Sequence, residues 1–374
     1  MRSLTGRRGT LGVGWILLAG LVAGPLRAQD ACDFPVADDP RGEAVADHLE
    51  AAVGRGFSGA VLVEIEGAVV HCAGHGWTDS TRTHPVSPGT LFFIASITKQ
   101  LTAAGILLLE EDGALDLSDP LGQFFPPLGG PASRIELHRL LTHTAGLAEN
   151  YQMDGIAARD SAVQAVFTAL PAAPAADFHY TNDAYGVLAA VIEAVSGQSF
   201  EAFVARRLLA PSGMRSTAFW GLVDDRDVTR FAQKSVERSP EMQLPNWGYR
   251  GASGIWSSVE DLYRWVRTAW RGDLIGAESR SRLFGPHLTL SGGTGIGYGT
   301  FTSTTSRGTR EIWARGTEDF GHNAVIRWLP EEAILVVLVS NSGEIEGIPA
   351  NQRISGEILE QILEESSGAG ALPR

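Results

Sequence analysis

The chain has 374 residues, of which 44% are hydrophobic and 20% are charged. This is the composition of a globular protein, and it excludes a disordered chain, a collagen-like chain and a coiled coil. The net charge of −13 at pH 7 repels phosphate backbones, so nucleic acid is not expected as a partner.

The first 28 residues have the pattern of a signal peptide. Three arginines within the first eight residues precede an apolar run over 11–22, and Ala28 is a small residue suited to cleavage. The pattern predicts export to the periplasm or the medium, and the Arg7–Arg8 pair leaves the Sec and twin-arginine routes open. Cleavage would take the net charge to −17, because the segment holds four arginines and no acidic residue. No later run is long and apolar enough to predict an integral membrane segment in the mature protein.

Residues 59–72 alternate apolar and polar side chains, which predicts a β-hairpin that turns at Glu66–Gly67. The two cysteines of the chain, Cys32 and Cys72, lie before this hairpin and at its end. An even number of cysteines in an exported protein permits a disulfide, and two unpaired thiols are the alternative. The sequence leaves both open.

The middle of the chain has helical periodicity, and strand-like runs return towards its end. Helices are predicted over 96–111, ended by Asp112–Gly113; over 183–196, ended by Gly197; and after a capping box of Ser257 and Glu260. Strands are predicted over 311–317, 323–330 and 332–341, before a closing helix over 351–365. The order predicts an α/β protein of the α+β type, with an antiparallel sheet built from both chain ends and flanked by helices. A mostly helical subdomain is expected over roughly 114–235.

Ser96 and Lys99 are the strongest chemical signal. Residues three apart share one face of a helix, so the hydroxyl and the amine can meet where the predicted helix starts. Burial disfavours a charged amine, and a neutral lysine beside a serine can act as the general base that makes the hydroxyl a nucleophile. The chain uses arginine almost throughout, with Lys99 and Lys234 as its two lysines, and arginine stays protonated in proteins. A capping serine followed by a solvated lysine is the alternative.

The chain resembles the superfamily of serine β-lactamases and penicillin-binding proteins, and within it class C β-lactamases, D-alanyl-D-alanine carboxypeptidases and related esterases. The resemblance spans most of residues 42–365. Its segments, in chain order, are LFFIASITKQLTAAGILLLEEDGALDLSDP, RLLTHTAGL, FHYTNDAYGVLAAVIEAVSG, LLAPSGM and GASGIWSSVEDLYRW. It implies a β-lactamase-like fold for residues 29–374, with the helical subdomain over a cleft, and an acyl-enzyme on Ser96 with Lys99 as general base.

The resemblance also implies roles for Tyr180 and Asn182, which match the Tyr-x-Asn motif of the family. Tyr180 would relay a proton between Ser96 and the leaving group, and Asn182 would hold the amide of the substrate. Residues two apart in an extended segment point the same way, so both side chains can face one cleft. Asn182 can at the same time be the N-cap of the helix that follows.

The third motif of the family, Lys-Thr-Gly or His-x-Gly, is changed to Trp-Ala-Arg-Gly-Thr-Glu over 313–318. Counting back from Gly321 places Arg315 where the family has its cation, as the group that binds a substrate carboxylate. Thr317 then stands where the family has glycine, and its side chain would narrow the substrate cleft. A register shifted by one residue matches Gly316 to that glycine instead, and a solvated Arg315 is the alternative to a binding role.

No metal or organic cofactor is expected for this chemistry. His71, Cys72 and His75 lie close together in the sequence, but no fourth ligand is evident and no metal site is predicted. His143 is interpreted as a residue that packs or caps a helix, because a serine–lysine pair needs no histidine.

The sequence predicts a serine hydrolase whose partner is a small-molecule or peptide substrate: a β-lactam, a D-Ala-D-Ala-type peptide, or a small ester or amide. One alternative is an esterase without lactamase activity, which the changed third motif favours. Another is a catalytically silent member that binds a ligand or a partner. The resemblance implies an oxyanion hole formed by the backbone N–H groups of Ser96 and of Thr317 or Glu318. The oligomeric state is left open.

Overall fold

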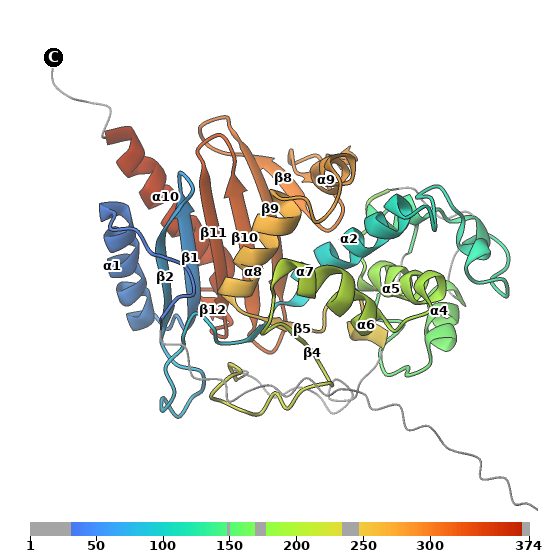
Figure 1. The fold of residues 1–374 in the computed structure, drawn as a ribbon, viewed down its shortest axis with the longest axis horizontal. Helices are drawn as coiled ribbons and strands as arrows, with labels where there is room; N and C mark the ends of the chain where they lie inside the picture. The colour runs from blue at the N-terminus through green and yellow to red at the C-terminus, as the bar shows by residue number, and fades with distance from the viewer. Residues whose placement is uncertain (1–30, 148–149, 169–176, 234–246, 369–374) are drawn as a thin grey trace, which may run out of the picture.

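The structure is a computed structural model, and it describes residues 31–147, 150–168, 177–233 and 247–368. The signal peptide expected over 1–28 lies outside the described residues. Figure 1 shows a sheet with helices on both sides and a mostly helical region beside it.

An eight-stranded antiparallel sheet is the central layer (Figure 1). Its strands lie in the order β2-β1-β11-β10-β9-β8-β7-β6, so the N-terminal hairpin pairs with a strand near the C-terminus. The strands are β1 (Gly59–Ile65), β2 (Ala68–His75), β6 (Leu288–Thr289), β7 (Gly295–Ile296), β8 (Phe301–Thr304), β9 (Arg310–Thr317), β10 (Asn323–Leu329) and β11 (Ile334–Ser340). Smaller sheets are formed by β3 (Phe92–Phe93), β5 (Ile255–Ser257) and β4 (Ala218–Phe219), and by β12 (Glu344–Ile345) and β13 (Ile348–Pro349).

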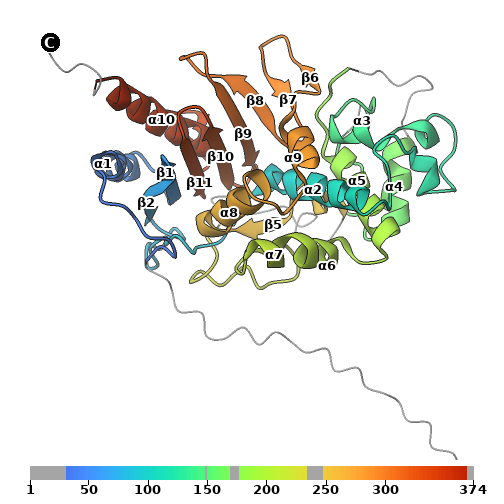
Figure 2. The same ribbon diagram turned by 45° about the horizontal axis from the view of Figure 1, so that its top comes forward.

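Helices cover both faces of the large sheet, as Figure 2 shows. They are α1 (Pro40–Gly54), α2 (Thr98–Glu111), α3 (Leu137–Leu141), α4 (Arg159–Thr168), α5 (Asn182–Ser196), α6 (Phe200–Val204), α7 (Ala210–Ser212), α8 (Val259–Trp265), α9 (Ala277–Phe284) and α10 (Ala350–Gly368). Side chains of α1 and α10 form one hydrophobic cluster with the sheet, and those of α2 and α8 belong to a second.

Strand β11 shows why the C-terminal half of the sheet is so apolar. Leu335 and Val337 belong to the cluster that contains α2, whereas Val336 and Leu338 belong to the cluster that contains α1 and α10. Alternate side chains of a strand point to opposite faces, so a strand covered on both sides needs an unbroken apolar run.

The predicted hairpin, helices and C-terminal strands are confirmed. Glu66 and Gly67 turn the hairpin with φ of 54° and 84°. Gly113 and Gly197 follow α2 and α5 with φ near 70°, the left-handed conformation in which glycine commonly ends helices. Helices α3 to α7 lie in the described part of residues 114–235, joined by loops and followed by β4.

The predicted capping box of Ser257 and Glu260 is wrong by one residue. Ser257 is the last residue of β5, and α8 begins at Val259. Ser258 is the N-cap, because its hydroxyl accepts a hydrogen bond of 3.2 Å from the backbone N–H of Asp261. Ser257 shares a hydrogen bond of 2.8 Å with the hydroxyl of Thr217 instead.

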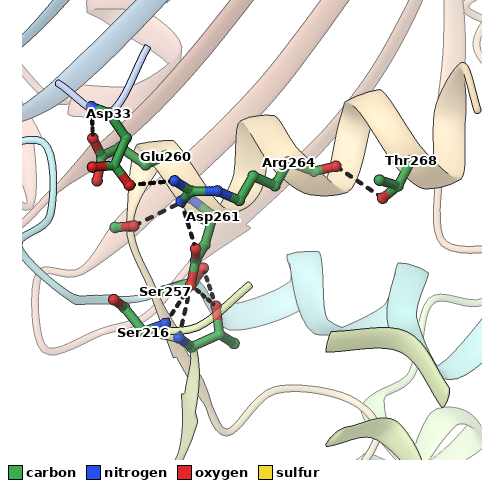
Figure 3. A network of polar contacts seen from close by, with 9 residues as sticks. Asp33, Ser216, Ser257, Glu260, Asp261, Arg264 and Thr268 are labelled. Carbon is green, nitrogen blue, oxygen red and sulfur yellow. Dashed lines mark hydrogen bonds and ion pairs between the residues drawn. The ribbon is translucent and has the colours of Figure 1, made fainter. Parts of the chain in front are cut away.

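A polar network and a disulfide attach the N-terminal segment to the sheet and to α8. Cys32 and Cys72 are joined by a disulfide, so the first of the two alternatives is the one observed. The backbone N–H of Asp33 donates to Glu260 over 2.6 Å. Figure 3 shows Arg264 between the carboxylates of Asp33 and Asp261. The segment ahead of α1 is thereby held at two points.

No single helix in the described ranges is long and apolar enough to cross a membrane. The helices over 182–196 and 200–212 pass that test only when taken together, and they are bent by 77° relative to each other.

The disulfide gives a stability prediction. It closes a loop with a sequence separation of 40, for which loop entropy predicts a loss of about 4 kcal/mol when the bond is removed. The double variant Cys32→Ser/Cys72→Ser should therefore unfold at a lower urea concentration than wild type. Its free energy of unfolding should be smaller by about 4 kcal/mol. Dithiothreitol should destabilise the wild type and leave the variant unchanged; equal stability of the two proteins under oxidising conditions would contradict the prediction.

Candidate active site

A single helical turn over Ala95–Ile97 connects β3 to α2 and carries Ser96. Ala95 adopts a φ of 48° there, which is uncommon for a residue with a side chain and is often found at functional sites. Since α2 continues from Thr98, Ser96 and Lys99 lie one turn apart on the same side of the helix. The distance from Lys99 Nζ to Ser96 Oγ is 3.0 Å.

The amine of Lys99 lies at the centre of the site. The residue is only 2% exposed, and its Nζ donates hydrogen bonds to three oxygens. These are Ser96 Oγ at 3.0 Å, Asn182 Oδ1 at 2.7 Å and the backbone oxygen of Ala252 at 2.9 Å. The three acceptors come from the turn before α2, the start of α5 and the loop before β5, so Lys99 holds these three segments together.

Tyr180 completes the group from the segment just before α5. Its hydroxyl donates to Ser96 Oγ over 2.9 Å, and its ring centroid lies 4.9 Å from Lys99 Nζ. The structure therefore brings together four of the predicted site residues: Ser96, Lys99, Tyr180 and Asn182. Ser96, Tyr180 and Asn182 are half-buried, so part of each residue is exposed and accessible to a substrate.

His143 lies directly behind Tyr180. The two rings are 4.4 Å apart between centroids and tilted by 31°, and His143 Nδ1 accepts a 3.3 Å hydrogen bond from the backbone N–H of Thr181. Burial and the positive charge of Lys99 hold the pKa of His143 well below its usual value. The neutral ring of His143 packs against Tyr180 and orients it. Tyr180 is therefore the residue against which the predicted packing histidine lies.

Asn150 is a supporting residue that the sequence interpretation did not find. Its Oδ1 accepts hydrogen bonds from the backbone N–H of Asn182 at 2.8 Å and from Thr181 Oγ1 at 3.1 Å. It thereby caps the start of α5 and holds Asn182 towards Lys99. An asparagine 32 residues before the start of the helix leaves no local sequence signal for this contact.

Strand β9 passes immediately beside the turn that carries Ser96. A Cβ at Gly316 would lie 2.1 Å from the backbone oxygen of Ile94 and 2.8 Å from the backbone nitrogen of Ser96. Only glycine permits this approach. Of the two registers considered for the third motif, the structure has the shifted one, with Gly316 against the serine.

Arg315 does not lie in the site, contrary to the prediction. Neighbouring side chains of a strand point to opposite faces, so Arg315 points away from the turn that Gly316 contacts. Its Nη1 donates to Gln352 Oε1 of α10 over 2.9 Å, and its guanidinium lies 5.4 Å from the Trp313 ring. The side chain of Thr317 shares the face of Arg315, so the backbone of Thr317, and not its side chain, borders the serine turn.

A family model described as Beta-lactamase matches residues 45–354. The chain belongs to this family. The serine β-lactamases and penicillin-binding proteins form a superfamily of serine hydrolases, and the β-lactamase-like fold expected from the resemblance is confirmed.

Individual relatives agree with this assignment. Penicillin-binding protein 4* of Bacillus subtilis (strain 168) is 27% identical over 267 residues, which cover 65% of this chain and 58% of the relative. The chain thus spans less than two thirds of the length of that curated relative. The octameric penicillin-binding protein homologue from Pyrococcus abyssi matches with a TM-score of 0.71 and 24% identity, over 88% of this chain and 78% of that one. D-amino acid amidase from Ochrobactrum anthropi SV3, complexed with L-phenylalanine amide, has a TM-score of 0.74 and 20% identity, over 87% of this chain and 99% of that one.

In this member of the Beta-lactamase family, a buried carboxyl supports the loop beside Asn182. Asp183 is 2% exposed, and its Oδ2 accepts a 2.9 Å hydrogen bond from the backbone N–H of Gln152. Burial raises the pKa of Asp183 to about 6. The folded state therefore binds this proton more tightly than the unfolded chain does, so the free energy of unfolding falls as pH rises from about 4 to about 6.

The variant Asp183→Asn should remove this dependence, because asparagine keeps an oxygen acceptor for Gln152 and carries no charge. The free energy of unfolding of the variant minus that of wild type should therefore be about 2 kcal/mol larger at pH 7.5 than at pH 4.5, so the variant gains stability relative to wild type as pH rises. Urea denaturation at both pH values measures the difference, with the exposed Asp47→Asn as control. The same pH dependence in wild type and Asp183→Asn would contradict the prediction.

Proposed function

We propose that the protein is a hydrolase that forms an acyl-enzyme on Ser96, with Lys99 as the general base. The observation that carries the proposal is the 3.0 Å contact between Lys99 Nζ and Ser96 Oγ in a buried, fully hydrogen-bonded setting. A nucleophile and its base within hydrogen-bond reach are the geometric requirement for this chemistry.

The partners of Lys99 orient the amine for this role. Asn182 Oδ1 and the backbone oxygen of Ala252 accept two of its hydrogen bonds. The third direction of the nitrogen then faces Ser96 Oγ. Once the amine has lost a proton, these two acceptors hold its remaining hydrogens, and its lone pair replaces the hydrogen bond donated to Ser96 Oγ, which is the arrangement for proton removal.

The reaction proceeds in two halves. Ser96 Oγ attacks the substrate carbonyl carbon while its proton passes to Lys99 Nζ; the bond to the leaving group then breaks, and Tyr180 delivers a proton to that group. Water then attacks the resulting ester and gives its proton to Tyr180. Lys99 returns a proton to Ser96 Oγ as the acid product leaves. The amide nitrogen of Asn182 binds the carbonyl of the substrate's amide.

Two backbone N–H groups stabilise the negative oxygen of the intermediate. One is that of Ser96. The backbone N–H of Glu318 donates to His322 on the β10 side over 2.9 Å, and successive N–H groups of a strand point to opposite sides. The N–H of Thr317 therefore points away from β10, where β8 pairs with β9 only as far as Trp313. Thr317 rather than Glu318 is the second donor.

Small esters and amides are the substrates that this site favours. Among the residues that the structure describes, Lys99 is the cation in contact with Ser96, Tyr180 and Asn182, and Arg315 faces α10. The rim is acidic: the charges of Glu318 and Asp319 add to burial in raising the pKa of the nearby Tyr151. A substrate carboxylate thus gains little here.

Turnover of β-lactams or D-Ala-D-Ala-type peptides is the second candidate, and the match to penicillin-binding proteins favours it. A catalytically silent binding protein is the third, and the close grouping of Ser96, Lys99 and Tyr180 argues against it. The disulfide between Cys32 and Cys72 supports action outside the cytoplasm, in the periplasm or the medium.

Covalent labelling distinguishes the three candidates. The mature protein is incubated with a fluorophosphonate, a labelled penicillin and a chromogenic short-chain ester, and intact-protein and peptide mass spectrometry locate any adduct. An ester or amide hydrolase is modified at Ser96 by the fluorophosphonate and turns over the ester, with little penicillin adduct. Rapid penicillin acylation of Ser96 would favour the second candidate, and no adduct with any probe would favour the third.

Arg315→Ala should leave the ratio of kcat/KM for anionic and neutral esters unchanged, because Arg315 faces α10. A selective loss of kcat/KM with anionic esters would return Arg315 to the site.

The general base has its own test. Lys99→Arg keeps a positive charge but cannot accept the serine proton, so ester turnover should fall by about 10²–10⁴-fold. Lys234→Arg makes the same change at the other lysine and should leave turnover near wild type. Circular dichroism checks that both variants fold, and near-normal turnover by Lys99→Arg would exclude Lys99 as the base.

A further inference from the structure

Two histidines face each other on β2, at the edge of the sheet that lies away from Ser96. His71 Nε2 and His75 Nε2 are 3.1 Å apart, and the rings are stacked with centroids 5.3 Å apart and planes 18° apart. Four residues along a strand return to the same face. The pairing partners of the two residues on β1, Val63 and Gly59, also share one face.

The two rings are held in place by their surroundings. His71 is 6% exposed, and a hydrogen bond with the backbone of Gly42, in the first turn of α1, orients its ring. Cys72 lies between the two histidines and is fixed by the disulfide to Cys32. Metal-ligating histidines are usually oriented in this way, by a hydrogen bond from the ring nitrogen that does not bind the metal.

Burial favours the neutral form of both imidazoles. Burial lowers the pKa of His71 to about 4, with a further contribution from the charge of His75, and burial lowers the pKa of His75 to about 4 as well. Neutral imidazole is the form that binds metals. In the absence of metal, one hydrogen lies between the two facing Nε2 atoms. A bound cation would replace that hydrogen.

We propose that His71 and His75 together bind one divalent transition-metal ion, of the zinc, nickel or copper type, through their Nε2 atoms. Two nitrogens at about 2.0–2.1 Å from one ion are about 2.9 Å apart at a right angle and about 3.3 Å apart at the tetrahedral angle. The observed 3.1 Å lies between these values. Imidazole as the protein ligand favours these metals over magnesium or calcium.

The protein supplies two ligands and water supplies the others. In the described part of the chain, the group of three metal-binding side chains that lies close together is Cys32, Cys72 and Glu260. Its two sulfurs are joined in the disulfide, so it is not a competing site. A site of two histidines is open to solvent ligands, and we expect it to bind with a dissociation constant in the micromolar range.

The metal would act on stability and not on hydrolysis. Strand β2 is separated from β9, which borders Ser96, by β1, β11 and β10. The histidines lie on the face covered by α1, whereas Ser96 leads into α2 on the other face. An ion bound only by the folded protein raises its thermal midpoint.

The test uses the untagged mature protein after treatment with a chelator. Isothermal titration with Zn²⁺ should give one equivalent bound, and thermal unfolding with excess Zn²⁺ should show a rise in Tm that EDTA reverses. His71→Gln and His75→Gln should each lower the affinity at least tenfold and abolish the Tm rise, while His84→Gln, in a loop, should retain both. Circular dichroism and the cooperativity of thermal unfolding confirm that these variants fold.

Three results would overturn the proposal. The first is the absence of binding by folded wild type. The second is binding that His71→Gln and His75→Gln leave unchanged, which would place the ion elsewhere. The third is a stoichiometry well above one with no dependence on either residue. None of these results bears on Ser96, so the proposed hydrolysis and the metal site fail independently.

Discussion

One buried amine holds the reactive part of the molecule together. Lys99 Nζ contacts oxygens of Ser96, Asn182 and Ala252, which come from three segments far apart in the chain. Burying this nitrogen is favourable only when its hydrogen-bonding directions are filled. The positions of α2, α5 and the loop before β5 are therefore coupled, and the arrangement that satisfies the lysine is also the one that places a base beside a serine.

The large sheet separates the reactive serine from the polar side chains that β9 and β2 present to its other face. On the side of α2, Gly316 lets β9 touch the serine turn and leaves the backbone of Thr317 next to it. On the side of α1 and α10 lie Arg315 with Gln352 and the pair of histidines on β2. Arg315, the arginine predicted to bind a substrate carboxylate, thus lies on the face covered by α10, which shifts the proposed substrates towards esters and amides.

Local patterns predicted most elements of the fold, because β11 needs an unbroken apolar run and α5 ends where Gly197 allows a left-handed turn. They also indicated Ser96 and Lys99, whose spacing is itself local. Contacts between distant segments were beyond reach: Asn150 and the backbone oxygen of Ala252 join the site only through the tertiary fold. The register of β9 failed for a related reason, since counting from Gly321 crosses a turn whose length the sequence alone does not determine.

The most direct test of the account is a crystal structure of the protein with a phenylboronic acid, which adds reversibly to an activated serine. A bond is expected from boron to Ser96 Oγ, with Lys99 Nζ and the Tyr180 hydroxyl within hydrogen-bond distance of that oxygen. One boronate oxygen should accept from the backbone N–H groups of Ser96 and Thr317. An unmodified Ser96 under saturating inhibitor, or a Lys99 side chain turned out of contact with it, would contradict the central claim.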